Sequence, residues 1–528
     1  MPLLDVLFNT TTLLSNVLPF LADWRITDMS RRPQQTGFSR VFVIQNSAGP
    51  AYVPVYQGLW MAGPLTWPQG DITTIKVPSE TQYDRFDVVD KVAGDQGDPS
   101  MPITARYTMD RSELLRLTKI GCDNDLQVHM GQCGDPRDFN AGWEKIVVLE
   151  KARITNYSTG ALGALQPADR AMINEEVPFT GERAFEILRQ TVAQQAAAQV
   201  VQEVLDITVC DAVTCGACGI ASDGCQIVFA LTISAGGSPG LPAEIVFTRN
   251  GGSTWSDTLI DTLAPSEDPV RLACVGSRLV VTNQTPGGIH YAPIADILAG
   301  TEVWVESTAG LTIPTGGPRA ILSVSPAHTW VFGAGGYIYF YSDITGTAAT
   351  QSPGDVTTQQ FNAAHATDVL NLVAVGNSNA VVYTRNGGST WVSVTGPAPA
   401  VNLNAVWMKS RTEWLVGTAG GRLFYTQNSG TTWTEKAFPG SGAGVVRDLS
   451  FTNNTVGYMT HDTAAVLGRV LRTIDGGNSW YIAPESGQGT TPDNDRLNAV
   501  SACKDDPNVA FVGGLGANAI DGIILKAA

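Results

Sequence analysis

One short motif occurs four times in the second half of the chain, and this repetition constrains the fold more than any other feature. The copies read TRNGGSTW at 248–255 and 384–391, TQNSGTTW at 426–433 and TIDGGNSW at 473–480. Their shared positions are Thr248, Asn250, Gly252 and Trp255; Thr384, Asn386, Gly388 and Trp391; Thr426, Asn428, Gly430 and Trp433; and Thr473, Asp475, Gly477 and Trp480. Internal repeats at a fixed period indicate a repeat architecture rather than an irregular globular core.

The spacing of the motif predicts a β-propeller. Consecutive copies are about 45 residues apart, and the interval from Trp255 to Trp391 has room for two degenerate copies. These are expected around Val303, Trp304 and Val305, and around Tyr341, Ser342, Asp343 and Gly346. One unit reads as four short strands: Leu403 to Met408, Glu413 to Gly417, Arg422 to Thr426, and Trp433 to Lys436. Four strands per period are typical of propeller blades, so residues 201–528 predict roughly seven blades.

Two details of the propeller follow from the same pattern. The stretch from Ile207 to Ala212 is either the first strand of blade 1 or the strand that completes the last blade, and its spacing favours the first. In each motif, Asn or Asp is expected to accept backbone hydrogen bonds, Gly to supply a positive φ, and Trp to pack into the blade core.

The motif resembles the Asp-box (BNR) repeat of sialidases, Vps10-type receptors and photosystem assembly-factor-like propellers. That resemblance implies a propeller scaffold and raises the question of glycoside hydrolysis. Sialidases hold their substrate with an arginine in an Arg-Ile-Pro context, whereas this chain has Thr312, Ile313 and Pro314. We therefore expect a protein that is not an enzyme and has no catalytic residues.

Residues 1–200 contain no copy of the repeated motif and predict a separate, mainly β domain of sandwich or barrel type with helices. Strand patterns occur at Val41 to Ile44, Ile103 to Tyr107, Leu126 to His129, Ile146 to Leu149, and Ala152 to Tyr157. Thr180 to Leu205 is rich in Ala, Gln and Glu and predicts one or two helices.

Three segments of this domain, Gly142 to Lys145, Ile154 to Leu165 and Glu175 to Glu182, resemble tail tube (major tail) proteins of long-tailed bacteriophages. The resemblance implies a structural virion protein, made in the host cytoplasm and located in the viral tail. Its subunits would assemble into stacked hexameric rings, contact other tail proteins and conduct DNA, while the propeller points outward and contacts a cell-surface glycan. The alternatives are a cellular assembly-factor or binding propeller and a sialidase-like hydrolase.

Charge and hydropathy narrow the range of partners. The formal net charge is −16, so the chain as a whole repels phosphate, which fits DNA passing without specific binding. No apolar run approaches the ~18 residues of a membrane span.

Four cysteines, Cys210, Cys215, Cys218 and Cys225, fall close together. Either two disulfides among them or a zinc ion held by four thiolates would account for the cluster. No other cofactor is expected. Cys274 and Cys503 occur in strand patterns of the propeller and are expected to be inert.

Overall fold

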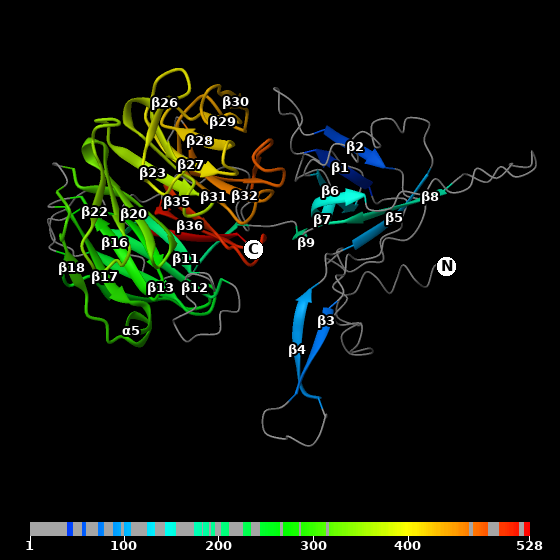
Figure 1. Cartoon of the computed structure of the whole chain (residues 1–528), viewed down its shortest axis with the longest axis horizontal. Coiled ribbons are helices and arrows are strands. Elements are labelled where there is room, and N and C mark those ends of the chain that lie inside the picture. The colour runs from blue at the N-terminus through cyan, green and yellow to red at the C-terminus, as the bar shows by residue number, and fades with distance from the viewer. Residues whose placement is uncertain are drawn as a thin grey trace, which may run out of the picture. The chain divides into compact units, whose positions relative to one another are not determined.

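The computed structural model describes individual strands in the first part of the chain and most of the chain after residue 191 (Figure 1). The described residues are 40–45, 55–59, 72–78, 88–96, 100–106, 124–131, 143–154, 174–181, 183–188, 192–195, 202–210, 225–233, 243–263, 268–284, 287–312, 316–463, 468–483, 496–516 and 522–527. The chain divides into two compact units, Met1–Arg189 and Gln190–Ala528. Among the described helices, none has the length and apolar character needed to cross a membrane.

The first unit contains a seven-stranded antiparallel sheet with the order β2-β1-β6-β7-β8-β5, in which β9 also pairs with β7, and a separate hairpin of β3 and β4. The strands are β1 (Arg40–Gln45), β2 (Val55–Leu59), β3 (Ile72–Pro78), β4 (Val88–Gln96), β5 (Ser100–Arg106), β6 (Asn124–Gly131), β7 (Trp143–Ile154), β8 (Asn174–Thr180) and β9 (Arg183–Leu188). The mainly β prediction is confirmed. The two strands predicted within residues 146–157 are one continuous strand, β7.

The helices predicted between Thr180 and Leu205 are wrong for the residues that the structure describes in this stretch. This stretch contains β9, then β10 (Val192–Gln194), and the start of β11 (Glu203–Cys210). Its Ala and Gln content favours a helix locally, but β9 pairs with β7 and β10 pairs with β37 (Gly522–Ala527), and such tertiary pairing overrides a weak local preference.

The second unit consists of seven four-stranded antiparallel sheets arranged as the blades of a β-propeller (Figure 1). Blade 1 is β11, β12 (Ile227–Ile233), β13 (Glu244–Thr248) and β14 (Ser256–Leu259); blade 2 is β15 (Pro269–Val275), β16 (Arg278–Asn283), β17 (Gly288–Pro293) and β18 (Val305–Ser307); blade 3 is β19 (Pro318–Ser325), β20 (His328–Gly333), β21 (Tyr337–Tyr341) and β22 (Ala349–Pro353). Blade 4 is β23 (Phe361–Ala366), β24 (Leu372–Gly376), β25 (Ala380–Thr384) and β26 (Val392–Thr395); blade 5 is β27 (Leu403–Met408), β28 (Trp414–Thr418), β29 (Leu423–Thr426) and β30 (Thr434–Lys436). Blade 6 is β31 (Val445–Phe451), β32 (Gly457–Asp462), β33 (Gly468–Thr473) and β34 (Tyr481–Ile482); blade 7 is β35 (Arg496–Ala502), β36 (Ala510–Leu515), β37 and β10.

The ring closes through two contacts between distant parts of the unit. β10 supplies the outermost strand of blade 7 and pairs Val192 with Ala527, while the innermost strands β35 and β11 lie against each other. As the spacing predicts, β11 is the first strand of blade 1. Because β10 belongs to the propeller, the domain boundary falls between Arg189 and Gln190 and not at residue 200.

The second strand of each blade lies in the core. All residues of β24, β28 and β32 are buried, with sequences such as WLVGT in β28. A strand in this position has a neighbouring blade on both faces, which accounts for continuous apolar runs in place of alternation.

The repeated motifs form the turns between the third and fourth strands of blades 1, 4, 5 and 6. In blade 1, the Thr248 hydroxyl accepts hydrogen bonds from the backbone N–H groups of Asn250 and Gly252, and Asn250 Oδ1 accepts one from the N–H of Thr254 at 2.8 Å. Gly252 has φ +94°, which an L-residue rarely adopts. The other three copies repeat these bonds.

The motif tryptophans divide between the predicted position in the blade core and contacts with a neighbouring blade. The rings of Trp433 and Trp480 contact Trp414 and Phe451 of their own blades, whereas the other two contact the preceding blade. Trp255 of blade 1 meets Phe511 of blade 7 edge to face at 6.3 Å, and Trp391 of blade 4 meets Phe332 of blade 3 at 5.9 Å. The degenerate copies lie at the corresponding turns of blades 2 and 3, where Trp304 is buried and Asp343 Oδ1 accepts the N–H of Thr345.

Candidate functional site

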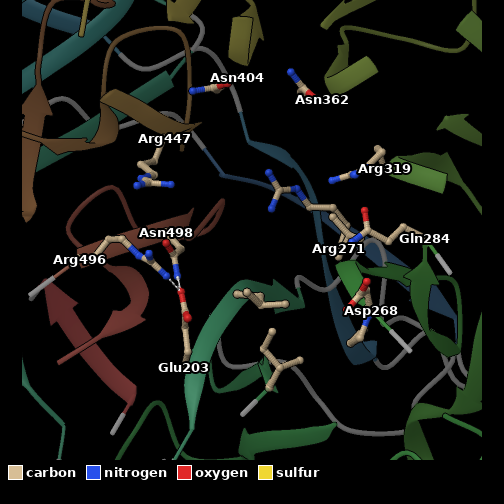
Figure 2. A pocket seen from close by; sticks show the side chains of 14 residues that line it. Glu203, Asp268, Arg271, Gln284, Arg319, Asn362, Asn404, Arg447, Arg496 and Asn498 are labelled. Atoms are coloured by element: carbon tan, nitrogen blue, oxygen red, sulfur yellow. Dashed lines mark hydrogen bonds and ion pairs between the residues drawn. The ribbon is translucent and has the colours of Figure 1, made fainter. Parts of the chain in front are cut away.

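The innermost strands of the seven blades surround the central channel of the propeller, and a polar cavity of about 410 Å³ opens at one end of this channel (Figure 2). These strands run in the same direction around the propeller, so their first residues meet at one end. The lining residues are Glu203, Leu205, Ile233, Asp268, Pro269, Val270, Arg271, Gln284, Arg319, Asn362, Asn404, Arg447, Arg496 and Asn498. A cavity of this volume with a few charged groups is typical of a site for a small ligand.

Every innermost strand carries a β-bulge near its start, and the extra residue lines the cavity. In each blade the register between the first and second strands shifts by one residue near the start of the first strand. From blade 1 to blade 7 these residues are Leu205, Val270, Arg319, Asn362, Asn404, Arg447 and Asn498. A bulge bends the strand and changes the direction of a side chain. The seven blades therefore present one side chain each to the same cavity.

Three of the bulge residues are asparagines that join one blade to the next. Asn362 Nδ2 donates to the carbonyl of Leu403 at 2.9 Å, and Asn404 Nδ2 donates to that of Val446 at 3.1 Å. Asn498 Nδ2 donates to the carbonyl of Val204 at 2.8 Å, across the closure between blades 7 and 1. Each of these carbonyls belongs to the residue before the bulge of the next blade. It lies on the inner edge of the innermost strand, where no further strand can pair with it, so the asparagine amide supplies its hydrogen bond.

The cavity lining contains four arginines and two carboxylates. Arg496 forms an ion pair with Glu203, whose Oε1 also accepts a hydrogen bond from Asn498 Nδ2 at 2.8 Å. Arg447 Nε donates to Asp462 Oδ2 at 2.6 Å. These two arginines are held by carboxylates of the chain itself.

Arg271 and Arg319 differ from the other two arginines, because neither forms an ion pair with any residue that the structure describes. Arg319 Nε donates to the carbonyl of Gly316 at 3.3 Å. Burial lowers the pKa of Arg319, and the neighbouring charge of Arg271 acts in the same direction, against the attraction of Asp268. Both side chains extend into the cavity in Figure 2.

Two buried aspartates lie directly after the bulges of blades 1 and 6. Asp206 Oδ2 accepts the N–H of Leu272 in blade 2, and Asp448 Oδ2 accepts the N–H of Val500 in blade 7. Burial raises the pKa of Asp206, and it raises that of Asp448 to about 6, although Arg271 opposes both shifts. Arg271 occupies the same strand position in blade 2, so one cation interacts with two carboxyl groups of the channel.

The predicted site residues are elsewhere. The Asp-box residues form turns next to the outer strands, and none of them lines the cavity. The cysteine cluster does not assemble as predicted: Cys210 is bonded to Cys274 and Cys225 to Cys503, with Cα–Cα distances of 6.1 and 5.6 Å. Cys215 and Cys218 lie outside the described residues. Cys274 and Cys503 are thus disulfide partners and not inert thiols, and their strands bring them beside Cys210 and Cys225.

Four thiolates for zinc are therefore not available in this arrangement, since two of them are in disulfides. Within the described ranges, no group of three or more His, Cys, Asp or Glu side chains is placed to hold a metal ion.

A signal for the cavity was present in the sequence. Phe361 to Ala364 reads FNAA, and 403–406 and 497–500 both read LNAV. The asparagine in each is a bulge residue. This second repeat is shorter than the Asp-box and lacks glycine, so it does not stand out as a turn motif. Arg271 is the only arginine at its strand position among the seven blades, and Arg319 shares its bulge position with one other arginine, Arg447, in a different local sequence.

No protein-family model and no curated protein matches this chain. Solved structures similar to it are YCF48 from Cyanidioschyzon merolae (16% identity, 64% of this chain and 98% of that chain, TM-score 0.46), a virginiamycin B lyase from Staphylococcus aureus in complex with quinupristin (13%, 64% and 99%, 0.48) and the WD40 repeats of RRP9 (8%, 64% and 97%, 0.46). These structural neighbours are propeller or repeat proteins. The strand topology of residues 190–528 is that of a seven-bladed β-propeller.

Proposed function

We propose that this chain is a binding protein, and that its propeller holds a small polar ligand in the cavity at the end of the channel without converting it. The observation that carries the proposal is the set of seven bulges. All seven direct a side chain to one cavity of about 410 Å³. The bulge asparagines also join neighbouring blades, but closing the ring does not require arginines at the bulges of blades 3 and 6, whereas recognition of a polar ligand uses such donors.

The chemistry of the lining supports binding. Guanidinium and amide groups donate several hydrogen bonds in fixed directions and fix the orientation of a ligand. Asparagines bonded to the neighbouring blade are rigid, as are the arginines held by Glu203 and Asp462. A preformed site of this kind loses little conformational entropy when a ligand binds.

The test is to fill the cavity. Leu205 and Val270 are apolar bulge residues, and a Leu205→Trp variant should occupy the space with little change to the polar network. We expect ligands found by ligand-observed NMR in a metabolite library to lose binding to Leu205→Trp. Leu259→Trp is the matched control, since Leu259 is exposed on an outer strand of the same blade. Equal binding to both variants would contradict the proposed site.

The first unit supports a second candidate, the tail tube role that its sequence resemblance implies. Its sheet is antiparallel, and among the described strands β2 and β5 each pair on one side only. Unpaired strand edges allow pairing between subunits, as a ring requires. Under this proposal the chain is part of a virion tail and the propeller is its ligand-binding domain. Electron microscopy of the purified full chain tests it: rings or tubes are expected, and particles of single chains at all concentrations would reject it.

A further inference from the structure

The channel contains its own example of how a carboxylate is bound. Glu203 stands two positions before the bulge of blade 1, and its Oε1 is held by Arg496 and by Asn498 Nδ2 at 2.8 Å. Arg496 and Asn498 belong to blade 7, the blade before it. An arginine and a bulge asparagine from one side of the channel thus bind a carboxylate from the neighbouring blade (Figure 2).

On the other side of the cavity, Arg271 and Arg319 form no ion pair with any described residue, although the buried Asp206 and Asp448 attract Arg271 from behind the lining. Arg319 is the bulge residue of blade 3, and Arg271 follows the bulge of blade 2. Asn362, the bulge residue of blade 4, donates from Nδ2 to Asn377 Oδ1 and to the carbonyl of Leu403, so the two arginines are the donors on this side. Asp268 attracts Arg319, but it is exposed and forms no ion pair with either arginine among the described residues. Figure 2 shows both guanidinium groups extending into the cavity.

Two guanidinium groups close together repel each other, and partial burial removes the water that would screen them. A bound anion offsets this repulsion. The planar fork of arginine matches the two oxygens of a carboxylate, and such charge-assisted bonds are about twice as strong as neutral ones. The net excess of positive groups in the lining contrasts with the net charge of −16 of the whole chain.

We propose that Arg271 and Arg319 bind the carboxylate group of a compact ligand, in the way that Arg496 and Asn498 bind Glu203. This inference rests on the proposed binding function and names its ligand class. The ligand is a small organic acid or the free carboxyl end of a short peptide, both of which present the same group to the cavity.

Isothermal titration calorimetry of the full chain tests the inference. The probes are succinate, a tripeptide with a free carboxyl end, the same tripeptide as its amide, and inorganic phosphate. We expect succinate or the free tripeptide to bind, and Arg319→Ala to weaken that binding by roughly tenfold or more. Arg271→Lys retains the charge beside Asp206 and Asp448 and should weaken binding less than Arg319→Ala. The control is Arg422→Ala, which removes an exposed arginine paired with Glu435 on an outer strand and should leave binding unchanged.

Each outcome is decisive. Succinate binding would identify an organic acid, and binding of the free tripeptide but not of its amide or succinate would identify a peptide end. Equal affinity of wild type and Arg319→Ala, preference for the amide, or binding of phosphate alone would overturn the carboxylate proposal. If neutral ligands bind and are lost in Leu205→Trp while no carboxylate binds, the cavity function stands and only this inference fails. Circular dichroism melting of each variant separates lost binding from lost folding.

Discussion

Cys225 and Cys503 are 278 positions apart and form a disulfide with a Cα–Cα distance of 5.6 Å. Cys225 comes just before the second strand of blade 1, and Cys503 directly follows the first strand of blade 7. The bond crosses the same closure as the pairing of β10 with β37 and the hydrogen bond from Asn498 to Val204. Three independent links therefore join the first and last blades.

Removing this disulfide should destabilise the propeller at its closure. We expect the Cys225→Ser/Cys503→Ser variant to lose about 2–5 kcal/mol in the free energy of unfolding, because the open chain gains conformational freedom. Hydrogen exchange should rise first in β35 and β11. The control is Cys210→Ser/Cys274→Ser, which removes a link between consecutive blades with a sequence separation of 64. Peptide mapping without reductant should recover the 225–503 and 210–274 pairs, and other pairings would contradict the structure.

The bulge asparagines should contribute separately to the cohesion of the blades. Replacing Asn404 by Ala removes its bond to the carbonyl of Val446 and leaves that carbonyl unpaired, at a cost of about 1–3 kcal/mol. Asn498→Ala should lower the free energy of unfolding more than Asn404→Ala does, since it also removes a hydrogen-bond donor from Glu203. Urea denaturation of the two variants gives the comparison. A smaller loss for Asn498→Ala than for Asn404→Ala would mean that the closure does not depend on this amide.

The propeller could be predicted from sequence because its signal is repeated and local. Thr, Asn or Asp, and Gly are each required by one tight turn, so the motif marks the same point in blades 1, 4, 5 and 6. The strands predicted for blade 5 agree with β27 to β30 to within about one residue. The number of blades then follows from the chain length divided by the period.

The disulfide partners, the closing strand and the cavity could not be predicted in this way. Cys225 and Cys503 meet only after the ring closes, and nothing near either residue specifies the other. β10 is short and lies in Ala- and Gln-rich sequence, so its local preference opposes the strand that pairing imposes. The arginines of the cavity depend on a bulge, whose effect on side-chain direction is visible only in the folded strand.

The hydroxyl of Thr384 should be essential to its turn. It accepts hydrogen bonds from the N–H groups of Asn386 and Gly388 and donates one to Asn386 Oδ1. Thr384→Val keeps the shape but leaves two backbone donors unpaired, and we expect a loss of about 1–3 kcal/mol in thermal or urea unfolding. Thr395→Val, on the exposed outer strand of the same blade, should change stability little. Equal effects of the two changes would show that the turn does not need the hydroxyl.

The buried Asp448 should make stability depend on pH. Burial raises its pKa to about 6 from an ordinary value of 3.8, so the folded protein binds a proton here that the unfolded chain has released. This contribution is complete below the ordinary value and is lost as pH rises through about 6, by up to about 3 kcal/mol. Asp448→Asn removes it, since an amide does not titrate. The stability of wild type relative to this variant should therefore be greater at about pH 5 than at about pH 7 in urea titrations.

Asp343→Asn is the control for the pH dependence. Hydrogen bonds from Thr345 lower the pKa of this exposed carboxyl, so it stays ionised at both pH values and its variant should show no such difference. An equal difference at both pH values for Asp448→Asn would mean that Arg271 keeps Asp448 ionised throughout.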